Sequence, residues 1–231
     1  MDLVTEQRLA RRAAILESAR QMIAERGYDA VTVRDLAERC RVSVPTLYNQ
    51  FGGKDQLLAA AIEDHFLLTQ DTAFYRNSEP GFARLLVIID QCADQLLEVP
   101  AYHQRLLEAF ASLDSTQQVQ ERAARALAEV IAVELRCMID KRQVSDWVAP
   151  LRLAGLLTSA CIGTSVQWSA GFIDAQFLKT NMRYAMGSVL LGVMRGRART
   201  ELETQVREAQ LALVDRDMRS NQTTQSDSRG T

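Results

Sequence analysis

The feature that most constrains this chain is a run of closely spaced helix start and stop signals between residues 32 and 53. Thr32 is followed three residues later by Asp35, a pattern typical of a helix N-terminus whose side chains cap the first turn. Ser43 precedes Pro45, and proline is tolerated in the first turn of a helix. Gly52 then ends the pattern. These signals predict two short helices joined by a tight turn.

Two short helices in this arrangement define a helix-turn-helix when the second one exposes a polar face. The second helix is predicted from Val44 to Gln50, with Leu47 and, just beyond it, Phe51 packed inward. Its outward side chains suit base edges, thymine methyl groups and phosphates. They are Pro45, Thr46, Tyr48, Asn49 and Gln50. Lys54 opens a fourth helix, where a phosphate would meet both its charge and the helix N-terminus. A solvated surface turn is the alternative from spacing alone.

Helical spacing of apolar residues continues along the rest of the chain, and we find no alternating strand pattern. The sequence is 47% apolar and contains only four prolines in 231 residues, which favours long helices. The predicted class is therefore all-α. The expected helices cover residues 7–26, 33–40, 44–50, 54–75, 82–98, 101–113, 116–142, 148–170, 174–196 and 201–214. Residues 215–231 are polar, and we expect them to be disordered.

Composition argues against several classes of protein. The four cysteines lack metal-ligand spacing, and the two histidines belong to no recognisable catalytic arrangement, so we expect no metal, no cofactor and no enzyme activity. The N-terminus lacks an apolar signal-peptide core. Residues 153–173 carry no formal charge, but their six Ser, Thr and Gln side chains favour a helix buried in protein over a membrane span. The net charge of −2 gives no general sign of nucleic-acid binding.

A more specific indication comes from ILESARQMIAERGYDAVTVRDLAERCRVSVPTLYNQFGGKDQLLAAAIEDHF. This run resembles the N-terminal DNA-binding domain of the TetR (TetR/AcrR) family of bacterial transcriptional regulators. The resemblance covers about 60 residues, 10–69, and includes Thr32-Val33, Leu36-Ala37, Val42-Ser43, Thr46-Leu47-Tyr48, Phe51 and Lys54. It implies a three-helix helix-turn-helix domain at 10–69, and a helical effector-binding and dimerisation domain at 70–214.

The resemblance also implies residue roles in DNA binding. Thr32, Tyr48 and Lys54 would bind phosphates, while Val44, Pro45 and Thr46 would enter the major groove. The remaining DNA-binding candidates are Val33, Arg34, Asn49 and Gln50. Arg8, Arg11 and Arg12 would either touch the flanking DNA backbone or form a solvated basic face.

The chain departs from the family pattern at four positions near this motif. Arg41 stands where the turn often has glycine, and it can adopt that backbone only at some energetic cost. Asn49 and Gln50 replace residues that are commonly aromatic or histidine, and Gln50 falls at a phosphate-facing position. Gly53 replaces a serine cap. These departures leave the operator sequence open.

The C-terminal half is expected to supply a homodimer interface and a ligand pocket. One recognition helix covers only one half-site, so specific binding needs two copies. By resemblance, the helices at 148–170 and 174–196 form the interface, with the monomer core as the alternative. The predicted contacts are Leu156, Gly163, Val166, Met186, Val189, Leu190 and Val193. The pocket candidates, for which ordinary core or surface placement is the alternative, are His65, Tyr102, His103, Arg105, Trp147, Gln167 and Trp168.

The sequence therefore predicts a ligand-responsive repressor that binds a palindromic operator on double-stranded DNA as a homodimer. A small lipophilic or aromatic effector would release it. The alternatives are a DNA-binding regulator without a small-molecule effector, or one controlled by a protein partner. We expect a cytoplasmic, nucleoid-associated bacterial protein with no membrane partner.

Overall fold

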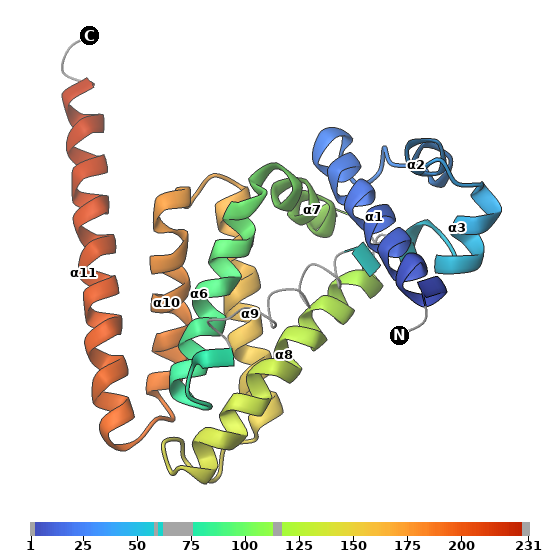
Figure 1. The fold of residues 1–231 in the computed structure, drawn as a ribbon. Coiled ribbons are helices and arrows are strands. Elements are labelled where there is room, and N and C mark those ends of the chain that lie inside the picture. The colour runs from blue at the N-terminus through green and yellow to red at the C-terminus, as the bar shows by residue number, and fades with distance from the viewer. Residues whose placement is uncertain (1–2, 58–59, 62–75, 113–116, 228–231) are drawn as a thin grey trace. The chain divides into compact units, whose positions relative to one another are not determined.

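The computed structural model describes residues 3–57, 60–61, 76–112 and 117–227, and these ranges are predominantly helical (Figure 1). The helices are α1 (Leu3–Arg26), α2 (Val33–Cys40), α3 (Val44–Phe51), α6 (Phe82–Glu98), α7 (Pro100–Ser112), α8 (Gln117–Asp140), α9 (Pro150–Ser169), α10 (Ala175–Leu191) and α11 (Gly196–Asp227). Within the described ranges, β-pairing is limited to one isolated bridge between Val144 and Met194. The predicted all-α class is confirmed. Of the predicted fourth helix, residues 54–57 and 60–61 are described, and they are helical.

The chain separates into two compact units. The first contains residues 1–76 and 95–127, and the second contains residues 77–94 and 128–231. The first unit therefore includes more of the chain than the predicted domain at 10–69. The physical reason is that α7 packs against α1, so part of the middle of the chain belongs to the N-terminal core.

The core of the first unit is built from the apolar faces of α1, α2 and α3, with the start of the fourth helix and α7 added. Leu47 of α3 and Leu36 of α2 are each only 1% exposed, so a buried leucine holds each short helix against the core of the first unit. Truncating a buried leucine of this kind costs about 2–5 kcal/mol of stability. The buried cluster comprises Ile15, Leu16, Ala19, Met22, Ile23, Tyr28, Val31, Leu36, Ala37, Leu47, Leu57, Ala61, Tyr102 and Leu106.

In the second unit, α10 packs against both α9 and α11. Gly187 of α10 makes the close approach to α11 possible, because a Cβ atom there would lie 2.6 Å from Cγ2 of Val206. On α11, Leu202 and Val206 are buried. The helices α10 and α11 therefore pack closely against each other within a single chain.

The last helix is longer than the sequence pattern predicted. We expected a helix at 201–214 followed by disorder, but α11 continues to Asp227. Ion pairs one turn apart support this polar helix, such as Arg219 with Asp215 at 2.8 Å. Arg216 also ties it to the start of α10, with its guanidinium 3.1 Å from Asp174 and 5.1 Å from the ring centroid of Phe177. Polar composition alone misses these contacts.

Candidate nucleic-acid interface

Side-chain caps fix the start of both helices in the helix-turn-helix. Thr32 Oγ1 accepts a hydrogen bond of 3.1 Å from the backbone N–H of Asp35. Ser43 Oγ accepts one of 3.2 Å from the backbone N–H of Thr46 and lies 2.7 Å from its hydroxyl. Both predicted caps are present in the structure. Caps of this type stabilise a helix by about 1 kcal/mol each, so they set where α2 and α3 begin.

The turn between the two helices places Arg41 in the left-handed region, with φ 53° and ψ 43°. Its backbone N–H donates to the carbonyl of Glu38 at 3.2 Å, and the N–H of Val42 donates to Ala37 at 3.0 Å. These bonds satisfy carbonyl groups at the end of α2. The arginine therefore takes the backbone conformation for which glycine is favoured, while its side chain remains exposed.

Helix α3 has one buried side and one exposed side, as the sequence indicated. Leu47 is buried, whereas Tyr48 is 51% exposed and Asn49 is also exposed. Phe51 is half-buried, and the guanidinium of Arg12 lies 4.8 Å from its ring centroid. Among the other predicted DNA-binding residues, those exposed are Thr32, Arg34 and Pro45, and those half-buried are Val33, Val44, Thr46, Gln50 and Lys54.

The two predicted phosphate-binding residues at the helix starts are brought together. Thr32 and Lys54 line the same small hollow, although 22 positions separate them in the sequence. The Nζ of Lys54 donates to the backbone carbonyl of Asp29 at 3.0 Å and lies 5.3 Å from the ring centroid of Tyr28. These contacts hold the ammonium group beside the N-terminus of α2. One anion could therefore meet a hydroxyl, a helix start and a lysine.

The charges on this unit are partly neutralised by local ion pairs. Arg39 donates two hydrogen bonds to Glu25, of 2.7 and 2.8 Å, and this bonding lowers the pKa of the Glu25 carboxyl. Arg34 lies 3.7 Å from Glu38 along α2, and both side chains are largely exposed. Burial, followed by the neighbouring Asp55 carboxylate, raises the pKa of the Tyr28 phenol, so it stays protonated at physiological pH. The guanidinium of Arg39 is therefore already paired with Glu25, whereas the side chain of Arg34 stays accessible to solvent.

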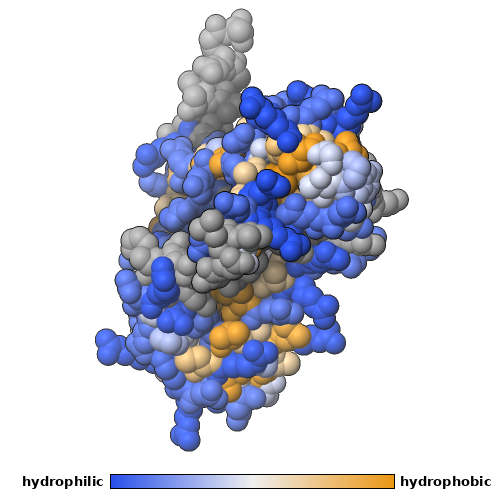
Figure 2. Space-filling view, turned by 45° about the vertical axis from the view of Figure 1, so that its right-hand side comes forward, coloured by the Kyte–Doolittle hydropathy of each residue, from blue (hydrophilic) through white to orange (hydrophobic). Residues whose placement is uncertain are grey.

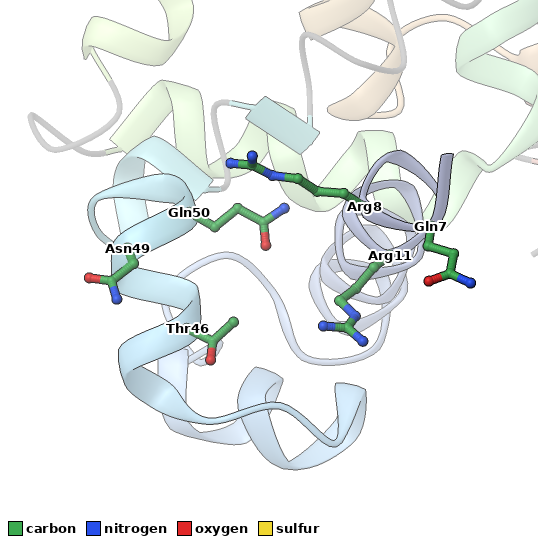
Figure 3. A pocket seen from close by; sticks show the side chains of 6 residues that line it. All are labelled: Gln7, Arg8, Arg11, Thr46, Asn49 and Gln50. Carbon is green, nitrogen blue, oxygen red and sulfur yellow. The ribbon is translucent and has the colours of Figure 1, made fainter. Parts of the chain in front are cut away.

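A second and larger hollow lies between the N-terminal part of α1 and helix α3. It has a volume of about 430 Å³ and is lined by Gln7, Arg8, Arg11, Thr46, Asn49 and Gln50. In Figure 3, the side chains of Gln50 and Thr46 point toward α1, while Asn49 points away from it. The sequence drew attention to the two arginines but not to Gln7. Its spacing of four residues from Arg11 on one helix face would have been the available signal.

The described effector candidates are divided between the two units. Tyr102, His103 and Arg105 fall in the first unit, where Tyr102 is buried in the core against α1. Trp168 is buried in the second unit, but Trp147 is 72% exposed. Gln167 is also exposed, and His65 lies outside the described residues. Tyr102 therefore contributes to the core of the first unit, and its role in a ligand pocket stays a prediction.

The predicted dimer residues divide into two groups. Leu156 is 61% exposed on α9, and Gly163 and Val166 share its exposed side. Met186 and Leu190 are fully buried within one chain, where α10 packs against both α9 and α11. Their place in a dimer interface stays a prediction. Val189 and Val193 are half-buried.

Apolar patches interrupt a mostly hydrophilic face of the molecule (Figure 2). In the second unit, large apolar side chains are exposed on both α9 and α11. They are Leu151, Leu156, Ile162 and Val166 on α9, and Leu211, Val214 and Met218 on α11. None of the described helices is both long enough and apolar enough to span a membrane.

Taken together, a capped pair of short helices, a buried anchor and an exposed polar face define a helix-turn-helix DNA-binding protein. Residues 15–61 match the model for bacterial regulatory proteins of the tetR family. The chain therefore carries the N-terminal DNA-binding domain of the TetR family of bacterial transcriptional regulators.

Individual relatives show how far this similarity extends. The transcriptional repressor KstR of Rhodococcus jostii is 24% identical over 168 residues, which cover 72% of this chain and 76% of KstR. The regulator Mb3439c of Mycobacterium bovis is 43% identical over 69 residues, covering 30% of this chain and 36% of its own length. A solved complex of SmeT with triclosan shares the fold, with a TM-score of 0.60 and 20% identity over 82% of this chain and 94% of SmeT.

Proposed function

We propose that this protein is a repressor that binds a palindromic operator as a homodimer and is released by a small lipophilic effector. The observation that supports operator binding best is the capped α2–α3 pair, which exposes Tyr48 and Asn49 and places Lys54 beside Thr32. A regulator of this kind acts on the nucleoid in the bacterial cytoplasm.

Within the half-site, the exposed residues divide into two tasks. Pro45 and Asn49 face outward from α3 and are suited to base edges. Val44 and Thr46 lie beside them at the start of α3, and Thr46 is held in place by its contact with Ser43. The hydroxyl of Tyr48, the hollow shared by Thr32 and Lys54, and the guanidinium of Arg34 are suited to phosphates.

Homodimer formation is supported by exposed apolar surface in the second unit. On α9, Leu156, Gly163 and Val166 recur at intervals of seven and three residues, so they share one face of the helix. A Cβ atom at Gly163 would meet nothing within 4 Å in the single chain, which leaves room for a close helix approach. We infer that this face of α9, together with the exposed apolar residues of α11, contacts the same surface of a second copy.

An effector site is supported by one buried polar group on α9. Thr158 is 3% exposed, and within the described part of the chain its hydroxyl has no hydrogen-bond partner. The hydroxyls of Thr164 and Ser165, on the same helix, donate to the carbonyls four residues earlier. A buried polar group left unpaired costs about 1–3 kcal/mol. A mostly apolar effector with one hydrogen-bonding group would satisfy Thr158, and the relative SmeT was solved with triclosan.

Release of the operator would follow from a population shift. The effector must bind the conformation that does not bind DNA more tightly than the one that does. The fourth helix, whose first turn carries Lys54, follows the recognition helix directly along the chain and would transmit the change. The alternatives are a regulator that needs no small molecule and one controlled by a protein partner.

Selection of binding sites from random DNA duplexes tests the proposal directly. The expected product is a two-fold symmetric site whose half-sites are separated by about one helical turn or a multiple of it. Sedimentation of the complex on the selected duplex should show an even number of protein chains. Failure to enrich any sequence, or enrichment of a single unpaired half-site, would refute sequence-specific binding by a homodimer.

A further inference from the structure

Two of the four cysteines meet in the core of the second unit. Cys92 lies on α6 and Cys161 on α9, two helices that run next to each other (Figure 1). Their side chains are 8% and 5% exposed, and their free thiols are hydrogen-bonded to each other. Two thiols in direct contact can undergo chemistry that a single buried cysteine cannot.

The contact between the two thiols is held in place by ion pairs on the other side of α6. Asp90 accepts a hydrogen bond of 2.6 Å from Nε of Arg183. Asp94 lies 2.6 Å from Nζ of Lys179. Both cations belong to α10, which also packs against α9. Because Cys92 is two residues from each aspartate, it projects from the opposite side of α6. The helices α6, α9 and α10 therefore hold the two sulfur atoms against each other.

The hydrogen bond between the thiols makes them chemically different. The bond from Cys92 lowers the pKa of the Cys161 thiol, although burial opposes this effect. The same contact, followed by burial, raises the pKa of the Cys92 thiol. The thiolate is the nucleophilic form of cysteine. Cys161 is therefore the sulfur that reacts first, and Cys92 is the thiol that follows.

We propose that Cys92 and Cys161 form a modification site at which a small hydroperoxide produces a reversible disulfide. The sulfur of Cys161 attacks the peroxide, so an S–O bond forms, the O–O bond breaks, and an alcohol or water leaves with the thiol proton. The sulfur of Cys92 then attacks the sulfenic acid, so an S–S bond forms and the S–O bond breaks. Water leaves with the proton of Cys92. The two thiols lose two electrons, and the hydroperoxide gains them.

Formation of the disulfide should displace α6 relative to α9, because a covalent S–S bond is shorter than a hydrogen bond between two sulfur atoms. Residues 82–94 of α6 belong to the second unit, and residues 95–98 belong to the first. One continuous helix thus connects the thiol pair to the unit that contains the helix-turn-helix. We expect the oxidised protein to bind its operator more weakly. This consequence rests on operator binding as proposed above, whereas the disulfide itself does not.

The first test uses the full-length wild-type protein, reduced and then treated with hydrogen peroxide. Tryptic digestion without reductant, followed by mass spectrometry, should show peptides 85–105 and 153–179 joined, with a mass two hydrogen atoms below their sum. Dithiothreitol should separate them. A bulky maleimide should instead label the half-buried Cys40 and Cys137 of the native protein, because the paired thiols are buried. Absence of the linked peptides from the oxidised wild type would overturn the proposal.

Serine variants test the order of the two steps. Cys92→Ser should stop at a sulfenic acid on Cys161, which dimedone traps, and Cys161→Ser should form neither the sulfenic acid nor the disulfide. Trapping on Cys92 in the Cys161→Ser protein would refute the assigned roles. The variant Cys40→Ser, Cys137→Ser is the matched control, and it should form the disulfide as the wild type does. Far-UV circular dichroism will verify that each variant remains folded.

The last test measures affinity for the selected operator before and after oxidation. Oxidation should weaken binding about 5-fold or more in the wild type and in the Cys40→Ser, Cys137→Ser control, and dithiothreitol should restore it. Peroxide should leave the affinity of Cys161→Ser unchanged. If the wild type enriches no operator, the proposed function fails, and the peptide test still decides the disulfide. A disulfide that forms without changing operator affinity would refute the coupling through α6.

Discussion

Replacing Arg41 with glycine should make the protein more stable, although it removes an exposed charged side chain from the DNA-binding unit. Arg41 has φ 53° and ψ 43°, a conformation in which Cβ crowds the following carbonyl oxygen. Glycine lacks the Cβ atom and adopts this region freely. Alanine keeps the crowding, so Arg41→Ala is the matched variant that removes the side-chain charge alone.

The expected magnitude follows from two opposing terms. The left-handed conformation costs an L-residue about 1–2 kcal/mol, and glycine loses about 0.5–1 kcal/mol more conformational entropy than alanine on folding. Arg41→Gly should therefore exceed Arg41→Ala in free energy of unfolding by about 0.5–1 kcal/mol. Arg142, with φ 57° in the second unit, provides an independent pair of variants.

Urea unfolding followed by far-UV circular dichroism measures the difference between the two variants. Both lose the same charge, so any loss of operator affinity should be equal for glycine and alanine at position 41. The corresponding changes at Arg142 should alter stability without altering operator affinity. The argument about backbone strain is refuted if Arg41→Gly is no more stable than Arg41→Ala. A loss of affinity in the glycine variant alone would mean that the turn conformation itself is needed for binding.

Four further changes test separate parts of the molecule. Lys54→Ala should weaken binding to every duplex equally and reduce the salt slope by about 0.9 per subunit, and altered base preference would contradict its phosphate role. Leu156→Arg should shift sedimentation toward the monomer; an unchanged dimer would exclude this face of α9. Thr158→Val should leave stability equal or higher but raise the effector concentration for half-release about 3- to 10-fold, as expected for one lost hydrogen bond. Hydrogen bonding to Arg39 lowers the pKa of the Glu25 carboxyl, so the Glu25→Gln variant should be less stable than the wild type above pH 4.5. This difference in stability should vanish as the pH falls through the lowered pKa of Glu25. A difference that persists in acid would exclude a stabilising role for this ion pair.

The helix-turn-helix could be predicted almost to the residue because local interactions determine it. Thr32 and Ser43 are required where they cap α2 and α3, and each bond spans only three residues. Leu47 must be buried for so short a helix to hold its place. Such signals are readable from sequence because every partner lies within one or two helical turns.

The hollow between α1 and α3 could not be predicted in the same way. Arg11 and Gln50 line one space only because the core of the first unit brings their helices together. Neither residue has a local pattern that indicates the other. The same limit applies to Tyr102, whose place in the core of the first unit depends on the packing of α7 against α1.

The dimer surface shows how one additional helix changes the meaning of an apolar pattern. The sequence interpretation assigned apolar residues of the helix at 174–196 to a dimer interface, with the monomer core as the alternative. In the structure, α11 returns along α10, and the close approach at Gly187 seals that contact within the chain. Leu178, Met182, Met186 and Leu190 of α10 are thus buried within the single chain. Exposed apolar area remains on α9 and α11, so a second copy is expected to pack against these two helices.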